Sequence, residues 1–328
     1  MIMTKKIIKK ILSYFFLGLR AGLGLFFRAR SWRPVWLYLN RYSRALYQRN
    51  RRPLNPVQHR LMEDLKRDGI AAVALSELFP GENVFAELRS YTDRLIDQAE
   101  TKTNKEFLRF LWDATPVLEL DNPFVRLSLR DKILDIVNAY MDLAAHFYYL
   151  TLNVTMPVPE GSQAVQSQRW HRDPEDKRMC KVFLYLTDVD EGAGPFPYVR
   201  GSQYGGKWGR LFPQQPPAGC YPPAGAIERI VPSSDIHVGT ARAGTLIFCD
   251  TSGLHRGGYA TQRERVMFTG GYCSSASPWP LRFKYPENSD EELKRLNFDP
   301  VQRHALQYDQ SAFVRLAFKK IKKGFKYG

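Results

Sequence analysis

The sequence predicts an α+β protein whose N-terminal helices lead into a double-sheet jelly roll. Apolar residues recur with the 3.6-residue period of a helix in segments 57–68, 83–99 and 131–144. From His146 onward the chain changes to short β-branched and aromatic runs, separated by Gly, Pro and Asp. Helices followed by many short strands are typical of an α+β chain whose strands stack in two sheets.

The strands are expected where these short apolar runs lie. One strand is expected among the helices, at 69–75. The later strands are expected at 148–155, 180–186, 196–199, 245–248 and 265–272. The segment 202–234 is rich in Gly and Pro and is expected to form a loop over the mouth of the barrel. Loops of this length are uncommon unless they are functional or disordered.

Positive charge is concentrated at the two ends of the chain. The net charge is +15, yet the first 60 residues contain 14 Lys and Arg and no acidic residue. The last 18 residues, 311–328, add six Lys and Arg and again no acid. The stretch between them is slightly acidic. We therefore expect a basic arm at 1–52, a folded domain at 53–310 and a basic tail at 311–328.

The N-terminal arm combines positive charge with apolar and aromatic residues. Its apolar run at 11–19 ends at Arg20 and falls short of the roughly 20 residues of a transmembrane helix. The composition favours an interfacial helix on an anionic membrane surface. Aromatic residues suited to a membrane boundary interleave with arginines, namely Trp32, Trp36, Tyr38, Tyr42 and Tyr47.

Two alternatives to the membrane interpretation stay open. The first is an ordinary packed helix pair with a basic outer face. The second is a nucleic-acid-binding arm, which is the least favoured because no recognised nucleic-acid-binding fold accompanies the basic segments. No obligate protein partner is indicated.

The cysteines bear on the cellular compartment. Cys180, Cys220, Cys249 and Cys273 form no C-x-x-C pair, which argues against a structural zinc site. Sparse cysteines in apolar strands suit a reducing compartment. Together with the basic arms, they predict a cytoplasmic protein held peripherally at the inner face of a membrane.

A candidate metal site begins at His171 and Asp173. Residues two apart share one face of a strand, so both side chains would project together. His255 follows the apolar run 244–248 and a turn, and it precedes two glycines. Two His and one carboxylate on one face of a metal ion form the triad of non-haem Fe(II) oxygenases. Each part alone is a weak signal, because H-x-D occurs by chance and a single His in a turn is ordinary.

A 2-oxo acid co-substrate needs a cation for its far carboxylate, and the planar fork of Arg suits a carboxylate. Arg265, ten residues beyond His255, opens the run at 265–272 and is the preferred candidate. Arg263 has the same strand parity and is the second candidate; a surface salt bridge is the alternative for either. Lys181, Gln168 and Asn153 lie near the expected metal-bearing strands and are further candidates, although each could equally be structural.

The order of these motifs resembles the phytanoyl-CoA dioxygenase family. The similar features are His171-x-Asp173, the strand–turn segment 181–202, the strand 244–248 leading to His255, and Arg265. The resemblance covers roughly 69–275 and excludes both basic ends. It implies a double-stranded β-helix with flanking N-terminal helices, and therefore a dioxygenase domain at 53–310. It also implies Fe(II) bound by His171, Asp173 and His255, with 2-oxoglutarate and O₂ as co-substrates.

The resemblance further implies hydroxylation of an aliphatic carbon, with succinate and CO₂ as co-products. Asp173 favours hydroxylation over halogenation, because related halogenases have a small residue in place of the carboxylate. We expect a small-molecule or lipid-linked substrate. Candidate substrate contacts lie in the long loop, at Lys207, Trp208, Arg210 and Arg229. The alternative is a catalytically inactive barrel that acts as a membrane-associated binding protein.

Overall fold

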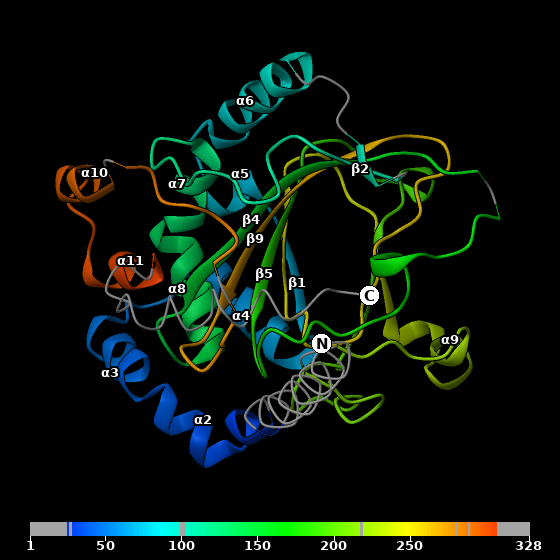
Figure 1. Ribbon diagram of the computed structural model, residues 1–328, viewed down its shortest axis with the longest axis horizontal. Helices are drawn as coiled ribbons and strands as arrows, with labels where there is room; N and C mark the ends of the chain where they lie inside the picture. The colour runs from blue at the N-terminus through cyan, green and yellow to red at the C-terminus, as the bar shows by residue number, and fades with distance from the viewer. Residues whose placement is uncertain are drawn as a thin grey trace, which may run out of the picture.

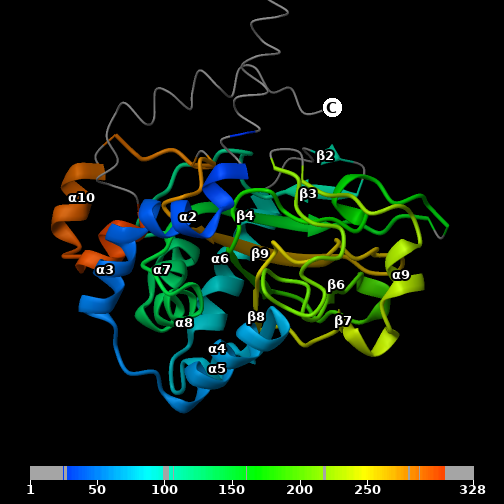
Figure 2. The ribbon, with the colours of Figure 1, turned by 90° about the horizontal axis from the view of Figure 1, so that it is seen from below.

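The centre of the structure is an antiparallel sheet with helices packed against one face (Figures 1 and 2). The computed structural model describes residues 25, 28–98, 103–105, 107–159, 161–216, 219–279, 281–287 and 289–306. The apolar run at 11–19 and the basic tail at 311–328 lie outside the described residues.

The main sheet contains seven strands in the order β1-β8-β5-β9-β4-β3-β2, and every neighbouring pair is antiparallel. Its strands are β1 (Ile70–Ala74), β2 (Thr103–Lys105), β3 (Leu108–Phe110), β4 (His146–Thr155), β5 (Cys180–Tyr185), β8 (Thr245–Cys249) and β9 (Arg265–Cys273). A second sheet pairs β6 (Phe196–Val199) with β7 (Ile236–Gly239).

The helices lie mainly before β4 and after β9 in the chain. They are α2 (Arg33–Leu39), α3 (Arg41–Asn50), α4 (Pro56–Asp68), α5 (Leu75–Leu78), α6 (Val84–Gln98), α7 (Pro123–Leu129), α8 (Asp131–Met141), α9 (Ala226–Ile230), α10 (Ser289–Arg295) and α11 (Pro300–Ala305). The sequence fixes the ends of α4 locally. Asn55 and Gln58 form a capping box at its start, and Gly69 ends it with a φ of 77°.

Side-chain alternation gives the main sheet two different faces. One face is apolar and packs against α4, α7 and α8 in the main core, with Leu152 of β4, Leu184 of β5 and Phe268 of β9 among its residues. The neighbouring positions along these strands point to the opposite face. That inner face carries the polar residues Asn153 of β4, Lys181 of β5 and Arg265 of β9, and all three are well buried.

The second sheet lies across the inner face. Phe196 of β6 packs on Phe183 of β5, with ring centroids 4.8 Å apart. Isolated bridges extend this second layer, because His255 pairs with both Tyr198 and His171, and Arg172 pairs with Cys220. Two facing layers of antiparallel strands agree with the predicted α+β class. The closed double-stranded β-helix stays a prediction.

The long regular elements agree with the sequence expectations to within a few residues. They are the helices α4, α6 and α8 and the strands β1, β4, β5, β6, β8 and β9. The segment 202–234 is largely irregular, as expected, although it also contains α9. Short elements such as α5, α7, β2, β3 and β7 were not predicted.

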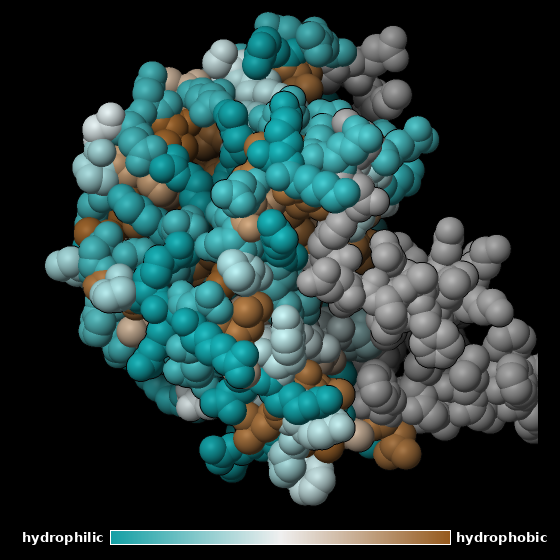
Figure 3. Space-filling view, turned by 90° about the vertical axis from the view of Figure 1, so that its left-hand side faces the viewer, coloured by the Kyte–Doolittle hydropathy of each residue, from teal (hydrophilic) through white to brown (hydrophobic). Residues whose placement is uncertain are grey.

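The described part of the predicted N-terminal arm packs against the domain. Trp36 of α2 and Leu46 and Tyr47 of α3 lie against the main core. The molecular face that carries α3, α10 and α11 is mostly hydrophilic, with hydrophobic residues in small separate groups (Figure 3). In the part of the chain that the structure describes, no helix is long and apolar enough to span a bilayer.

Arg30 ties the N-terminal segment to the centre of the fold. Its guanidinium is fully buried and donates hydrogen bonds to the carbonyls of Pro174, Glu175 and Ala276. It also lies 3.8 Å from the buried carboxylate of Asp176. Arg30 therefore acts as an internal brace, whereas the sequence led us to expect the arginines of this arm at a membrane surface or, alternatively, on a basic outer face.

We expect Arg30→Met to lower the free energy of unfolding by about 3–5 kcal/mol, because the change leaves the Asp176 carboxylate buried without its counter-charge. Urea denaturation followed by circular dichroism measures this loss. Arg28→Met is the matched control, since Arg28 is exposed and two residues away. Equal unfolding midpoints for the two variants would show that Arg30 is not a brace.

Candidate metal centre

The backbone brings His171 and His255 together directly. The His171 amide donates to the carbonyl of His255 at 2.8 Å, and the His255 amide donates back at 3.0 Å. The Asp173 amide donates to the carbonyl of Thr251 at 2.9 Å. One ligand atom from each of His171, Asp173 and His255 lies within 4.8 Å of the other two. The predicted triad is therefore assembled, and its three residues can hold a metal ion.

The histidine rings are oriented by neighbouring carbonyl groups. Nδ1 of His171 lies 2.8 Å from the carbonyl of Arg169, and Nδ1 of His255 lies 3.0 Å from that of Gly253. Because a carbonyl only accepts, each Nδ1 carries the proton and each Nε2 keeps its lone pair. The Nε2 atoms lie 3.7 Å and 3.6 Å from the two carboxylate oxygens of Asp173.

The electrostatics of the triad favour the protonation states that metal binding requires. Burial by itself would raise the pKa of Asp173, but Lys181 and the two histidines outweigh it and hold the pKa below its usual range. The Lys181 ammonium donates to the Asp173 carboxylate at 2.6 Å. Burial, with His171 nearby, lowers the pKa of His255 to about 3. Asp173 is thus ionised and His255 neutral at physiological pH, as metal ligands must be.

Arg265 lies buried on the inner face without an acidic partner in the described part of the chain. It begins β9 opposite Thr155 of β4. Its guanidinium donates to the carbonyl of Gly194 and, at 3.1 Å, to the hydroxyl of Thr155. Its Nε is buried without a hydrogen-bond partner. A buried guanidinium that meets only neutral groups is costly, and a carboxylate ligand would complete it.

Arg263, the second candidate, lies elsewhere. It precedes β9, its side chain is 64% exposed, and it forms an ion pair with Asp190 on the surface. The structure therefore separates the two arginines, with Arg265 inside and Arg263 outside.

The two remaining polar candidates, Asn153 and Gln168, lie in different surroundings. Asn153 is buried on the inner face, with Oδ1 lacking a hydrogen-bond partner. Gln168 is buried in the short turn before His171, where its Oε1 accepts from the amide of Val165. Asn153 is thus available to a ligand on the inner face, whereas the contact of Gln168 is structural.

The four candidate substrate contacts in the long loop meet other groups or solvent. Lys207 and Trp208 both bind the Asp235 carboxylate, at 2.7 Å and 3.0 Å. Arg210 and Arg229 are exposed. No hydrogen bond or ion pair between described residues joins any of the four to the triad. Tyr221 from the same loop does reach it and stacks on His171, with ring centroids 5.6 Å apart.

Arg172, between the two ligands on the H-x-D strand, was missed from the sequence. Its side chain is buried and donates all five N–H groups to backbone carbonyls. The acceptors are the carbonyls of Ser202, Trp208, Leu211, Phe212 and Ser252. Strand alternation could have indicated that this residue points away from the metal, but not what it binds.

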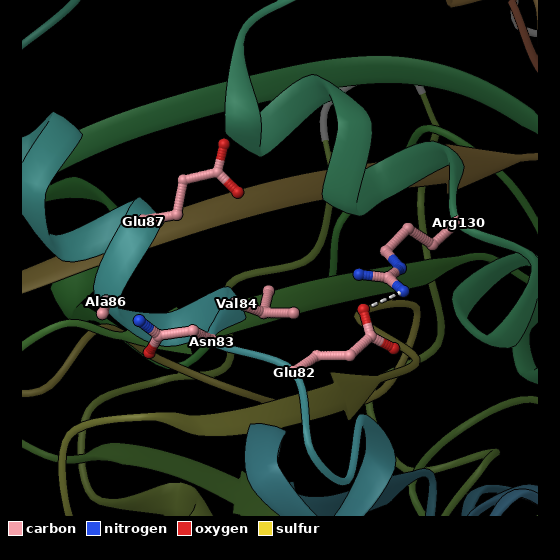
Figure 4. A pocket seen from close by; sticks show the side chains of 6 residues that line it. All are labelled: Glu82, Asn83, Val84, Ala86, Glu87 and Arg130. Carbon is pink, nitrogen blue, oxygen red and sulfur yellow. Dashed lines mark hydrogen bonds and ion pairs between the residues drawn. The ribbon is translucent and has the colours of Figure 1, made fainter.

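A hollow of about 530 Å³ at the start of α6 is not part of this centre. Glu82, Asn83, Glu87 and Arg130 line it, together with Val84 and Ala86. Figure 4 shows Arg130 and Glu82 facing each other across it, and they form an ion pair of 2.5 Å. Its charged groups are mostly paired with each other or with Arg126, so it provides no cluster of metal ligands.

Comparisons with known proteins show the fold. No protein-family model matches the chain, and no curated protein sequence matches it. The crystal structure of the epimerase SnoN with Fe³⁺, alpha ketoglutarate and nogalamycin RO is similar over 69% of this chain and 87% of that chain, with 16% identity and a TM-score of 0.51. At this identity the similarity shows a common fold.

Two further structures were matched with lower scores. AviO1 from Streptomyces viridochromogenes Tue57 is matched over 70% of this chain and 100% of that chain, with 16% identity and a TM-score of 0.48. EctD from S. alaskensis with bound Fe is matched over 71% and 84%, with 13% identity and a TM-score of 0.46.

We expect His255→Ala to weaken the binding of Co²⁺, a spectroscopic substitute for Fe²⁺, by at least about 100-fold, since it removes a ligand and not merely a supporting contact. Anaerobic titration followed by the visible d–d absorption measures the affinity. His237→Ala is the control, because His237 lies in β7 and contacts Arg200. Similar Co²⁺ affinities in both variants would contradict the triad.

Proposed function

We propose that this protein is an Fe(II)- and 2-oxoglutarate-dependent oxygenase that hydroxylates an aliphatic carbon. The proposal is carried by the buried Arg265, which has no acidic partner among the described residues. It lies on the inner face of the main sheet, and Lys181 of that face contacts the His171–Asp173–His255 cluster. A metal cluster alone would fit many proteins. A metal cluster that faces a sheet surface carrying an uncompensated guanidinium fits a ligand that binds metal at one end and carries a carboxylate at the other.

The donor set fits ferrous iron. Two neutral imidazoles and one carboxylate on one side of an ion leave three positions for exogenous ligands, as in non-haem Fe(II) oxygenases. SnoN, which has the same fold, was crystallised with Fe³⁺ and alpha ketoglutarate. When bound, the iron and 2-oxoglutarate would supply the coupling of O₂ reduction and decarboxylation to oxidation of a substrate carbon.

The protein's own residues would bind the metal, orient 2-oxoglutarate and shield the centre from water. The Nε2 atoms of His171 and His255 and the Asp173 carboxylate would hold the metal, and Lys181 would keep Asp173 ionised. Arg265 would bind the far carboxylate through a charge-assisted hydrogen bond. Phe196, 5.6 Å from the His255 ring, and Tyr221 against His171 would limit access of water.

The finer assignment rests on the motif order. The arrangement from Lys181 to Arg265 supports membership of the phytanoyl-CoA dioxygenase family within the larger group of 2-oxoglutarate oxygenases. The substrate is proposed to be a small molecule or a lipid-linked molecule. Proteins with this fold also catalyse other reactions, since SnoN is an epimerase. The mass of the product distinguishes the two reactions, because hydroxylation adds one oxygen atom to the substrate and epimerisation adds none.

We further propose a location at the cytoplasmic face of an anionic membrane. Support comes from large exposed rings at the start of α2 and within α2 and α3, where Trp32, Tyr38 and Tyr42 are 67%, 63% and 66% exposed. Arginines accompany them on the same helices. Rings of this kind favour the boundary between water and lipid headgroups. Nucleic acid stays the least favoured partner.

We expect Arg265→Ala to weaken 2-oxoglutarate binding by about 10- to 100-fold, the loss expected for charge-assisted hydrogen bonds of roughly 1.5–3 kcal/mol. Anaerobic titration of the Fe(II) protein with 2-oxoglutarate, followed by the weak visible charge-transfer band of the chelate, measures the affinity. Arg263→Ala is a matched control, two residues away and on the surface.

Three outcomes of this titration are informative. A band in the wild type and in Arg263→Ala that weakens in Arg265→Ala supports the proposal. Equal weakening in both arginine variants would contradict the assigned role of Arg265. No band in folded, iron-loaded protein would favour the inactive binding protein over the oxygenase.

We expect Trp32→Ser/Tyr42→Ser to reduce sedimentation with vesicles of phosphatidylglycerol and phosphatidylcholine several-fold, because the rings would no longer bury apolar area in the headgroup region. The control is Ile230→Ser/Val238→Ser, which removes exposed apolar side chains from other surfaces. Point variants are preferable to deletion of 1–52, since that deletion would also remove the Arg30 brace. Equal sedimentation of both variants would refute the membrane role of these rings.

A further inference from the structure

A second pocket lies between the N-terminal helices and the segment that follows the metal ligands. Its volume is about 340 Å³, in the range of small-molecule sites. Four parts of the chain distant in sequence form its wall: α2–α3, the end of α8, the segment after Asp176, and the start of the long loop. The lining residues are Arg33, Trp36, Leu37, Arg44, Met141, Asp142, Lys177, Arg178 and Tyr204.

The pocket is strongly positive. Four of its lining residues are cations, and Asp142 is its one acid. Arg44 neutralises Asp142 through an ion pair of 2.7 Å. Arg33, Lys177 and Arg178 form no ion pair with any acid in the described ranges. Three like charges around one hollow repel each other, so an anion in the hollow would be favoured.

The side chains of Lys177 and Arg178 contact aromatic rings and not acidic groups. Lys177 lies with its Nζ 4.0 Å from the centre of the Tyr204 ring, and Arg178 lies 5.6 Å from that of Tyr140. The indole N–H of Trp36 and the Nε of Arg44 are buried donors without a hydrogen-bond partner. Unpartnered buried donors are uncommon in folded proteins, and an ion or water at the site is one of the things that satisfies them.

The rest of the pocket wall can pack against the apolar part of an organic ligand. Trp36, Leu37 and Met141 contribute apolar surface beside the cations. Inorganic phosphate needs only the charges, whereas an organic phosphate uses both the charges and the apolar wall. The combination therefore fits a phosphate ester.

We propose that this basic pocket is a binding site for a phosphate ester, separate from the metal centre. Arg33, Lys177 and Arg178 bind the phosphate oxygens, and Trp36, Leu37 and Met141 contact the carbon part. The proposal does not rest on the oxygenase function, because none of the lining residues is a proposed ligand of iron or 2-oxoglutarate. The ester could be supplied as a soluble metabolite or as a lipid headgroup, and the two arms of the experiment separate these sources.

The first arm uses a soluble probe. Full-length protein with ¹⁵N-labelled Trp side chains is titrated with glycerol 3-phosphate, and with glycerol as the probe that lacks phosphate. The indole resonance of Trp36, identified by its loss in Trp36→Phe, should shift saturably with glycerol 3-phosphate and stay in place with glycerol. We expect Arg33→Gln/Lys177→Gln to weaken this binding at least 10-fold.

A matched double variant controls for net charge. Arg49→Gln/Arg51→Gln also removes two positive charges next to the same helices, but both arginines are exposed and neither lines the pocket. This control should bind glycerol 3-phosphate as the wild type does. Thermal unfolding of both variants checks that they are folded, and neither change removes an ion pair between described residues.

The second arm uses membranes. Vesicles of phosphatidylcholine with phosphatidic acid are compared with phosphatidylcholine alone by sedimentation. Weaker binding by the pocket variant than by the charge control, without saturable binding of glycerol 3-phosphate, assigns the site to a lipid headgroup. Saturable binding of glycerol 3-phosphate that only the pocket variant loses assigns it to a soluble ester. Identical behaviour of the two variants in both arms overturns the proposal.

Discussion

Two backbone hydrogen bonds between His171 and His255 set the geometry on which the candidate metal centre depends. Each residue donates to the other, so the two imidazoles start from directly opposed backbone positions. Strand alternation then places Asp173 on the same side, and Thr251 fixes its amide. Arg172, between the ligands, points the other way and fastens this short ladder to the long loop. The ligands are thus held by backbone pairing before any metal binds, which is the kind of preorganisation that a metal site needs.

The same alternation explains why one sheet can serve both packing and chemistry. Its helix-covered face is apolar and supplies the core, while its inner face carries Asn153, Lys181 and Arg265. Buried polar groups destabilise a fold unless they are satisfied. Lys181 is satisfied by Asp173, whereas Arg265 meets only neutral groups among the described residues, namely a carbonyl and hydroxyls. Local destabilisation of this kind is expected where a protein is shaped for a ligand instead of for stability.

The sequence indicates those parts of the site that depend on local periodicity. His171 and Asp173 share a strand face, and Arg265 starts a strand, so their placement follows from short patterns. Strand parity would place Arg263 on the same face as Arg265, but β9 begins only at Arg265 and the preceding residues belong to a surface loop. The contacts of Lys207 and Trp208 depend on a long irregular segment whose course is fixed by Arg172. No local sequence pattern predicts contacts between residues so far apart in the chain. For the same reason, the sequence did not show that the predicted arm packs against the domain.

Arg30 has a consequence for the order in which the chain can mature. Its hydrogen bonds reach residues 145 and 246 positions further along the sequence. During synthesis, a segment made early must wait for partners made late, and closing such long loops is entropically slow. The carbonyls of Pro174 and Glu175, next to the Asp173 ligand, are among the groups that wait. Competence to load metal should therefore depend on synthesis through Ala276, beyond the last ligand His255, because only then can Arg30 anchor the segment that follows Asp173.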